Sequence, residues 1–121
     1  MLHPHLFTFS DLQAEGDKLK SIIKLNAGHP IFKGHFPGQP VLPGVCMMQM
    51  VKEVTEVYID KKIRLLKARE LKFLSLIDPV EHTSIQIELS VKATDGGIKV
   101  DARLFNSTTL FFKFSGLFIQ R

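Results

Sequence analysis

One histidine in this chain lies in a stiff segment that could hold its imidazole in place for proton transfer. His35 begins a run that is rich in proline and glycine and extends to Val45, HFPGQPVLPGV. Each proline fixes its own φ and biases the preceding residue toward an extended backbone, while the glycines permit tight turns. A neutral imidazole accepts a proton near physiological pH, so His35 in a stiff loop is a candidate general base. The alternative, that the loop is only a turn, stays open at this point.

A helical pattern follows this loop and carries polar side chains close to it. From Pro43 to about Ile59, apolar residues recur at steps of three and four, and Pro43 suits the first helical position. The first half of this segment is apolar around most of its circumference, so we expect the helix to be buried nearly all round. Gln49 and Glu53 are four residues apart and therefore share one face.

The loop and the start of the helix resemble a family motif. The β-hydroxyacyl-acyl-carrier-protein dehydratases of the FabZ/FabA type carry His-Phe-Pro-Gly-x-Pro-(Val/Ile)-Met-Pro-Gly-Val, followed by a helix. This chain differs at Leu42, where Met is usual, and its Phe32-Lys33-Gly34 also fits. A weaker similarity covers Lys67 to Gln120. The resemblance implies an α+β hotdog fold, in which a curved antiparallel sheet wraps around one long central helix, with no cofactor and no metal.

The resemblance also implies a reaction, the elimination of water from a β-hydroxyacyl thioester. That reaction needs a base for the proton beside the carbonyl, a donor for the developing enolate oxygen, and an acid for the leaving hydroxyl. His35 matches the family's base. Gly44 matches the glycine whose N–H binds the thioester oxygen, at a helix start where amides lack acceptors and the dipole is positive. The residues expected to contact substrate are Phe36, Pro37, Gly38, Val45 and Glu53.

Position 49 departs from the family pattern. The family has Glu or Asp fourteen positions after the histidine, supplied from the other subunit, whereas this chain has Gln49. An amide holds a hydroxyl or a water but has no useful proton to give, and losing an acid or base costs roughly 10²- to 10⁴-fold in rate. Glu53 lies one helical turn away, about 5.4 Å. It either replaces the missing acid or is a solvated or salt-bridged helix residue.

The rest of the chain has the patterns of a sheet. Strands are predicted at Lys18 to Leu25, Ile85 to Lys92, Ile98 to Leu104 and Leu110 to Ile119. Asp95-Gly96-Gly97 predicts a hairpin turn, Leu6 to Leu12 a strand end or a short helix, and Arg69 to Leu76 a strand of mixed composition. An antiparallel meander after one apolar helix must cover that helix. Family members pair as dimers, often as trimers of dimers, and pairing would also cover an exposed sheet edge.

Composition limits the classes of protein to consider. The 121 residues predict one domain, 1–121, with 45% hydrophobic and 23% charged residues. A net charge of +4, spread along the chain, suits an acidic partner such as acyl carrier protein and does not indicate nucleic-acid binding. Cys46 is the single cysteine, and neither a signal peptide nor a membrane-spanning run is present, so a cytoplasmic protein is predicted.

Three functional hypotheses follow from these observations. In the first, the chain is a FabZ-like dehydratase acting on a β-hydroxyacyl chain carried by acyl carrier protein, as a homodimer or a trimer of dimers. In the second, Gln49 marks a subunit that binds acyl thioesters but catalyses weakly and forms a heteromer with an active paralogue. In the third, the chain is a hotdog thioesterase, which the intact HFPG-x-P motif disfavours.

Overall fold

The computed structural model describes residues 1–33 and 38–121. Within these ranges the chain forms seven strands, one short 3-10 helix and one α-helix. In chain order they are β1 (Phe7–Phe9), β2 (Gln13–Glu15), β3 (Lys18–Leu25), the 3-10 helix (Pro30–Phe32), α1 (Gly44–Ile59), β4 (Ile63–Phe73), β5 (Ser84–Thr94), β6 (Gly97–Phe105) and β7 (Leu110–Gln120). No helix in the described part of the chain is both long and apolar enough to cross a membrane.

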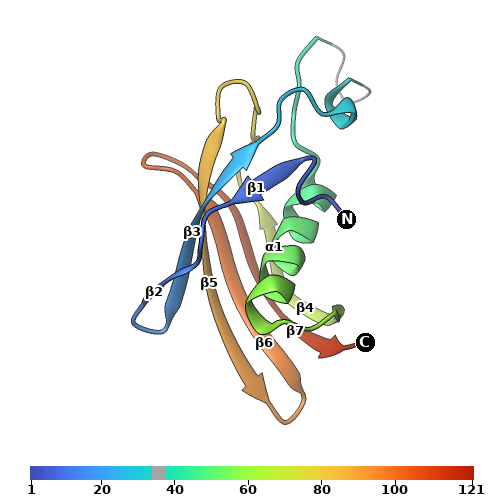
Figure 1. The fold of residues 1–121 in the computed structure, drawn as a ribbon, viewed down its shortest axis with the longest axis vertical. Coiled ribbons are helices and arrows are strands. Elements are labelled where there is room, and N and C mark those ends of the chain that lie inside the picture. The colour runs from blue at the N-terminus through green and yellow to red at the C-terminus, as the bar shows by residue number, and fades with distance from the viewer. Residues whose placement is uncertain (34–37) are drawn as a thin grey trace.

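The strands form one antiparallel sheet that curves along α1 (Figure 1). Its order is β1-β3-β5-β6-β7-β4, and β2 pairs with the other end of β3. Strands β5, β6 and β7 are a meander, and the predicted hairpin turn joins the first two of them. The expected architecture of a curved sheet around one helix is therefore confirmed.

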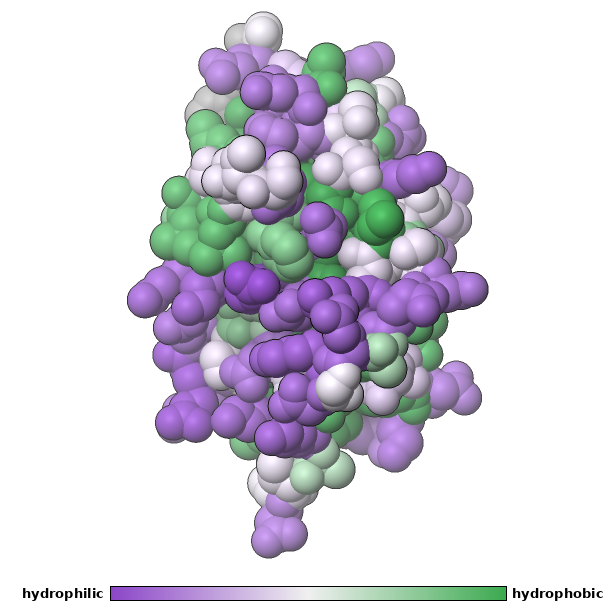
Figure 2. All heavy atoms as spheres, turned by 90° about the vertical axis from the view of Figure 1, so that its left-hand side faces the viewer, coloured by the Kyte–Doolittle hydropathy of each residue, from purple (hydrophilic) through white to green (hydrophobic). Residues whose placement is uncertain are grey.

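Alternation along the strands decides which side of the sheet faces the helix. Ile85, Ile87 and Leu89 on β5 are buried, and the side chains between them point outward. The outer face carries charges: the Glu88 carboxylate lies 3.2 Å from Nε of Arg103 and 3.8 Å from Nζ of Lys20. Figure 2 shows this side of the molecule, where hydrophilic side chains are abundant. One face of the sheet is thus left to form the core with α1.

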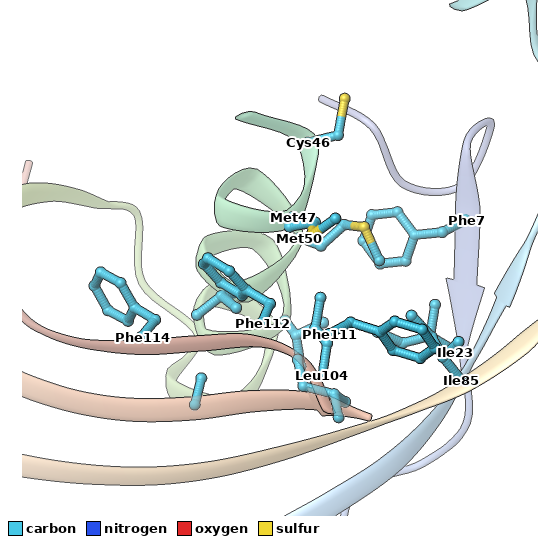
Figure 3. Packing of buried hydrophobic residues seen from close by; sticks show 14 of the residues in the cluster. Phe7, Ile23, Cys46, Met47, Met50, Ile85, Leu104, Phe111, Phe112 and Phe114 are labelled. Carbon is cyan, nitrogen blue, oxygen red and sulfur yellow. The ribbon is translucent and has the colours of Figure 1, made fainter. Parts of the chain in front are cut away.

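Phenylalanine side chains of β7 make up much of that core. Phe111, Phe112, Phe114 and Phe118 are all buried. From the helix, Met47 and Met50 point into the same layer (Figure 3). Burying one large apolar side chain is worth about 1.5–3 kcal/mol, so this contact contributes strongly to holding the helix on the sheet.

The helix differs from the sequence expectation at its start and on one side. Pro43 is the N-cap, one position before the first helical residue, because its ψ of 145° is extended. The expectation that the helix is buried nearly all round is wrong for this chain alone, since Val45 is 75% exposed and Val57 and Tyr58 are also exposed. The sheet of this chain covers only one side of α1.

Strand β4 also starts earlier than predicted, at Ile63 rather than Arg69. Its pairing with β7 shifts register between Leu65 and Lys67 and again between Ala68 and Glu70. Each irregularity inserts an extra residue and interrupts the alternation of apolar and polar side chains. The first half of the strand therefore lacks the period that would have revealed it.

One glycine of β7 allows β4 to approach closely. A Cβ atom on Gly116 would lie 2.8 Å from the carbonyl oxygen of Lys67 on β4 and 2.5 Å from the ring of Phe114. Real Cβ atoms do not come so close to other heavy atoms, so the backbone of β4 depends on a residue without a side chain at position 116.

We expect Gly116→Ala to lower the free energy of unfolding by about 1–3 kcal/mol, because the added methyl group overpacks the β4–β7 contact. Urea unfolding measures this change. The matched control is Gly96→Ala in the exposed hairpin turn, where the nearest atom to the new Cβ would be Leu117 Cδ2 at 3.6 Å. Equal losses in the two variants would contradict this account.

Candidate functional site

The start of α1 presents backbone amides that have no acceptor in the described chain. The amides of Cys46 and Met47 donate to the Pro43 carbonyl, but those of Gly44 and Val45 donate to no described residue. Within residues 1–33 and 38–121 no side chain caps this end, and the first turn of the helix holds no acidic residue. The positive end of the helix dipole is therefore available to an oxygen atom that carries negative charge.

An aromatic ring covers one side of this helix start. A Cβ on Gly44 would lie 2.9 to 3.3 Å from three ring atoms of Phe73, which stacks on Phe112 at a centroid distance of 5.1 Å. The absence of a side chain at position 44 lets the ring lie there. The two residues line one apolar groove together with Leu42, Met47, Leu74, Ser75 and Leu76.

The carboxylate of Glu53 is buried further along the same helix. It is 1% exposed and accepts hydrogen bonds from backbone amides near the N-terminus. The Leu2 amide lies 2.9 Å from Oε2 and 3.1 Å from Oε1, and the His3 amide lies 2.9 Å from Oε1. The Gln49 side chain donates from Nε2 to Oε2 at 2.8 Å. Each carboxylate oxygen is therefore hydrogen-bonded.

These contacts set the charge of Glu53. Burial alone would raise the pKa of its carboxyl group. Hydrogen bonds from the His3 and Leu2 amides and from the Gln49 side chain outweigh burial, so the pKa lies below its ordinary value. The group is therefore ionised at neutral pH and has no proton to donate.

Gln49 lies between the helix start and Glu53. Its side chain is half-buried, and its Oε1 accepts no hydrogen bond from any described residue. The five positions that separate it from Gly44 correspond to about 7.5 Å along the helix axis. Gly44 and Gln49 thus lie on one helix but on different sides of it, because five positions turn the helix by about 140°.

The predicted site residues are only partly brought together by the described structure. His35, Phe36 and Pro37 lie outside the described residues. Gly38 has a φ of +84° and lies in a surface hollow lined by His29, Phe32 and Pro40. Gly44, Val45, Gln49 and Glu53 are all on α1.

The interpretation of Glu53 as a solvated or salt-bridged residue is corrected here, because it is buried and its recorded partners are two backbone amides and one side-chain amide. Sequence reasoning also missed Phe73 as the cover of Gly44. No sequence signal marked this contact, because Phe73 lies on β4, whose register shifts break the alternation of buried and exposed residues.

Other reactive groups are less suited to chemistry in the described chain. Burial raises the pKa of the Cys46 thiol, which keeps it protonated and weakly nucleophilic. In residues 1–33 and 38–121, no group of three or more histidine, cysteine, aspartate or glutamate side chains is arranged to hold a metal ion.

The curved sheet and its single helix define the class of the protein, the hotdog fold. The dehydratase heterocomplex ApeI:P from Xenorhabdus doucetiae matches it with a TM-score of 0.72 and 15% identity, covering 93% of this chain and 96% of that chain. A conserved protein from Pseudomonas aeruginosa matches with a TM-score of 0.65 and 14% identity, covering 95% and 88%. These likenesses confirm the predicted fold.

Sequence comparison identifies the family. The model of the ApeI-like family, described as ApeI dehydratase, matches residues 11–108, and the chain belongs to this family. The 3-hydroxyacyl-[acyl-carrier-protein] dehydratases FabZ of Salmonella arizonae and Salmonella newport are each 33% identical over 82 residues. The match covers 64% of this chain and 54% of theirs, so the chain spans about half the length of these relatives.

We expect Glu53→Gln to lower the free energy of unfolding at pH 7 by about 2–3 kcal/mol, the worth of hydrogen bonds to a charged group. The folded pKa is lowered, so this stability is present above the unfolded pKa and is lost as pH falls through the folded one. Wild type and variant should therefore converge in acid, below the ordinary carboxyl pKa of about 4.3.

Urea unfolding at several pH values tests this expectation, with Glu81→Gln as the control at an exposed glutamate. The control should change stability by no more than about 0.5 kcal/mol. A Glu53→Gln deficit that stays constant down to strongly acidic pH would contradict a stabilising carboxylate.

Proposed function

We propose that this chain removes water from a β-hydroxyacyl chain carried as a thioester on acyl carrier protein, as a (3R)-hydroxyacyl-acyl-carrier-protein dehydratase in fatty acid or related acyl-chain biosynthesis. The observation that carries the proposal is the helix start, where the amides of Gly44 and Val45 donate to no described residue and Gly44 lines an apolar groove. A thioester oxygen needs the amides, and an acyl chain needs the groove. Membership of the ApeI-like dehydratase family supports the same reaction.

In this proposal each group has one task. His35 takes the proton from the carbon beside the carbonyl, and the electron pair left behind forms the enolate. The Gly44 N–H donates to the developing oxyanion. As the enolate collapses, the double bond forms and the C–O bond to the β-hydroxyl breaks. Phe36, Pro37, Gly38 and Val45 contact the substrate around these atoms.

The leaving hydroxyl also needs a proton, and the residues of α1 limit where it comes from. Gln49 has no acidic proton, and Glu53 is ionised and already accepts hydrogen bonds on both oxygens. We therefore assign Gln49 the task of holding the hydroxyl group. Glu53 contacts Gln49 and acts on the substrate only through it. The proton that His35 has taken is then available to the departing oxygen, which leaves as water.

A second subunit is part of the proposal. β4 is the last strand of the sheet order, and apolar side chains are exposed on it and on the segment that follows. They are Leu65, Leu66, Leu71, Phe73, Leu74 and Leu76. An open apolar edge next to the groove suits pairing with another hotdog subunit, as a homodimer, a trimer of dimers or a heteromer with a paralogue. The protein would act in the cytoplasm.

The purified protein should convert a β-hydroxyacyl thioester to the enoyl thioester, which ultraviolet absorbance of the conjugated product measures. His35→Ala should lower this rate by at least about 10²-fold, because the general base is lost. The matched control is His5→Ala, which removes an exposed imidazole.

The same reaction mixture, assayed for free thiol, separates dehydration from thioesterase activity. Release of thiol in place of the enoyl product would favour the thioesterase. Failure of the homomer to turn over would refute the dehydratase proposal for this chain alone.

The alternative function is a subunit that binds acyl thioesters and catalyses weakly beside an active paralogue. Gln49 is the observation that favours it, because it stands at the family's acidic position. In this alternative the partner supplies the carboxylate. The solved ApeI:P heterocomplex is a dehydratase assembly of two named components, and the comparable arrangement for this chain is a proposal.

Gln49→Glu tests whether position 49 is the missing acid. The new carboxyl group would lie beside the Glu53 carboxylate, whose negative charge should raise its pKa and help it hold a proton at neutral pH. We expect dehydration to accelerate by at least about 10²-fold in this variant, the lower end of the range of general acid catalysis. Gln86→Glu, at an exposed position on β5, is the control. An unchanged rate would count against position 49 as the missing acid.

A further inference from the structure

The buried carboxylate of Glu53 fixes which end of the Gln49 amide faces it. An ionised carboxylate only accepts hydrogen bonds, so the nearest amide group must present its N–H. The 2.8 Å contact from Gln49 Nε2 to Glu53 Oε2 has this geometry. The opposite arrangement would place two oxygen atoms against each other, which is repulsive. The carbonyl Oε1 of Gln49 is therefore the end that remains for another partner.

Two backbone amides hold the carboxylate in its own position. The Leu2 and His3 amides donate to Glu53 from a segment that is fifty positions away in sequence. That segment is itself packed, since the His3 ring lies 5.5 Å from the Phe7 ring and 5.1 Å from the Phe9 ring. The N-terminal residues thus belong to the support of the helix face.

We propose that Glu53 is a positioning residue, which turns the carbonyl oxygen of Gln49 toward the substrate so that it accepts a hydrogen bond from the β-hydroxyl group. This inference rests on the proposed function, because it concerns the substrate of the same site. The inference adds a source of substrate specificity, because the carbonyl oxygen of Gln49 favours a substrate group that donates a hydrogen bond. An acyl chain without the β-hydroxyl group leaves Gln49 Oε1 without this hydrogen bond.

The inference makes a prediction about two ligands that differ by one hydroxyl group. A 2,2-difluoro-3-hydroxyacyl pantetheine thioester has no proton on C2 and cannot undergo the elimination. The matched ligand is the 2,2-difluoroacyl thioester of the same length without the hydroxyl. Wild-type protein, in the assembly that it forms, should bind the hydroxy ligand roughly two- to tenfold more tightly, the net worth of one hydrogen bond. Calorimetric titration measures both affinities.

Glu53→Gln should remove this preference. An amide at position 53 can either accept or donate a hydrogen bond, so it no longer fixes which end of the Gln49 amide faces it. Glu56→Gln is the matched control. Glu56 is also buried on α1 and accepts from a backbone amide, that of Ile63 at 2.9 Å, and it has no recorded contact with Gln49. The control should keep the wild-type preference. In a Gln49→Ala background, Glu53→Gln should have no further effect on the ratio of the two affinities.

The outcomes separate the two levels of the inference. If wild type binds neither ligand, the proposed function fails and the positioning role falls with it. If both ligands bind and Glu53→Gln lowers the two affinities equally, Glu53 is only structural and the inference is overturned, while the proposed function survives. Loss of the preference in Glu53→Gln alone supports the inference.

A measurement on the wild type covers the case in which Glu53→Gln does not fold. The side-chain amide protons of Gln49 should be shifted by the carboxylate and protected from exchange with water, as nuclear magnetic resonance detects. The exposed Gln13 and Gln86 give the reference within the same molecule. Exchange of the Gln49 protons as fast as that of these references would overturn the inference.

Discussion

The contact between the apolar side of α1 and the phenylalanine-rich face of β7 is the constraint on which the other features depend. It places the helix along the concave face of the sheet. Because the helix is held by its buried methionines, its first turn is fixed in space. The position of its amides, next to the Phe73 ring at the end of β4, is then fixed as well. A loosely packed helix would leave the same amides without a fixed direction.

The same packing explains which parts of the fold were open to prediction. The regular alternation of Ile85 to Val91 and of Ile98 to Leu104 is what a sheet with one buried face requires, and these strands were predicted nearly in full. β4 was not, because two register shifts break its period. The exposed Val45 was misjudged because hydrophobicity alone does not tell whether a side chain is covered by its own chain or by another one.

Prediction of the candidate site was limited in a different way. Gly44 and Gln49 were identified from motif spacing, and the structure places both on α1, while His35 lies outside the described residues. The burial of Glu53 was not predicted, because its partners Leu2 and His3 contribute backbone amides, which every residue except proline has. No pattern of side chains marks such a contact across fifty positions. The spacing of Gln49 and Glu53 could be read from the sequence, whereas the burial and the lowered pKa of Glu53 could not.

The contact between Gly44 and Phe73 joins the edge strand of the sheet to the start of the helix, where the candidate site lies. Phe73 lies at the end of the exposed edge strand, and its ring lies against the first residue of the helix. A neighbour that pairs with this edge would lie next to the half-exposed ring, and therefore next to the first amides of the helix. Under the proposed dehydratase function, the tightness of subunit pairing would then bear on the activity of each subunit as well as on the stability of the assembly.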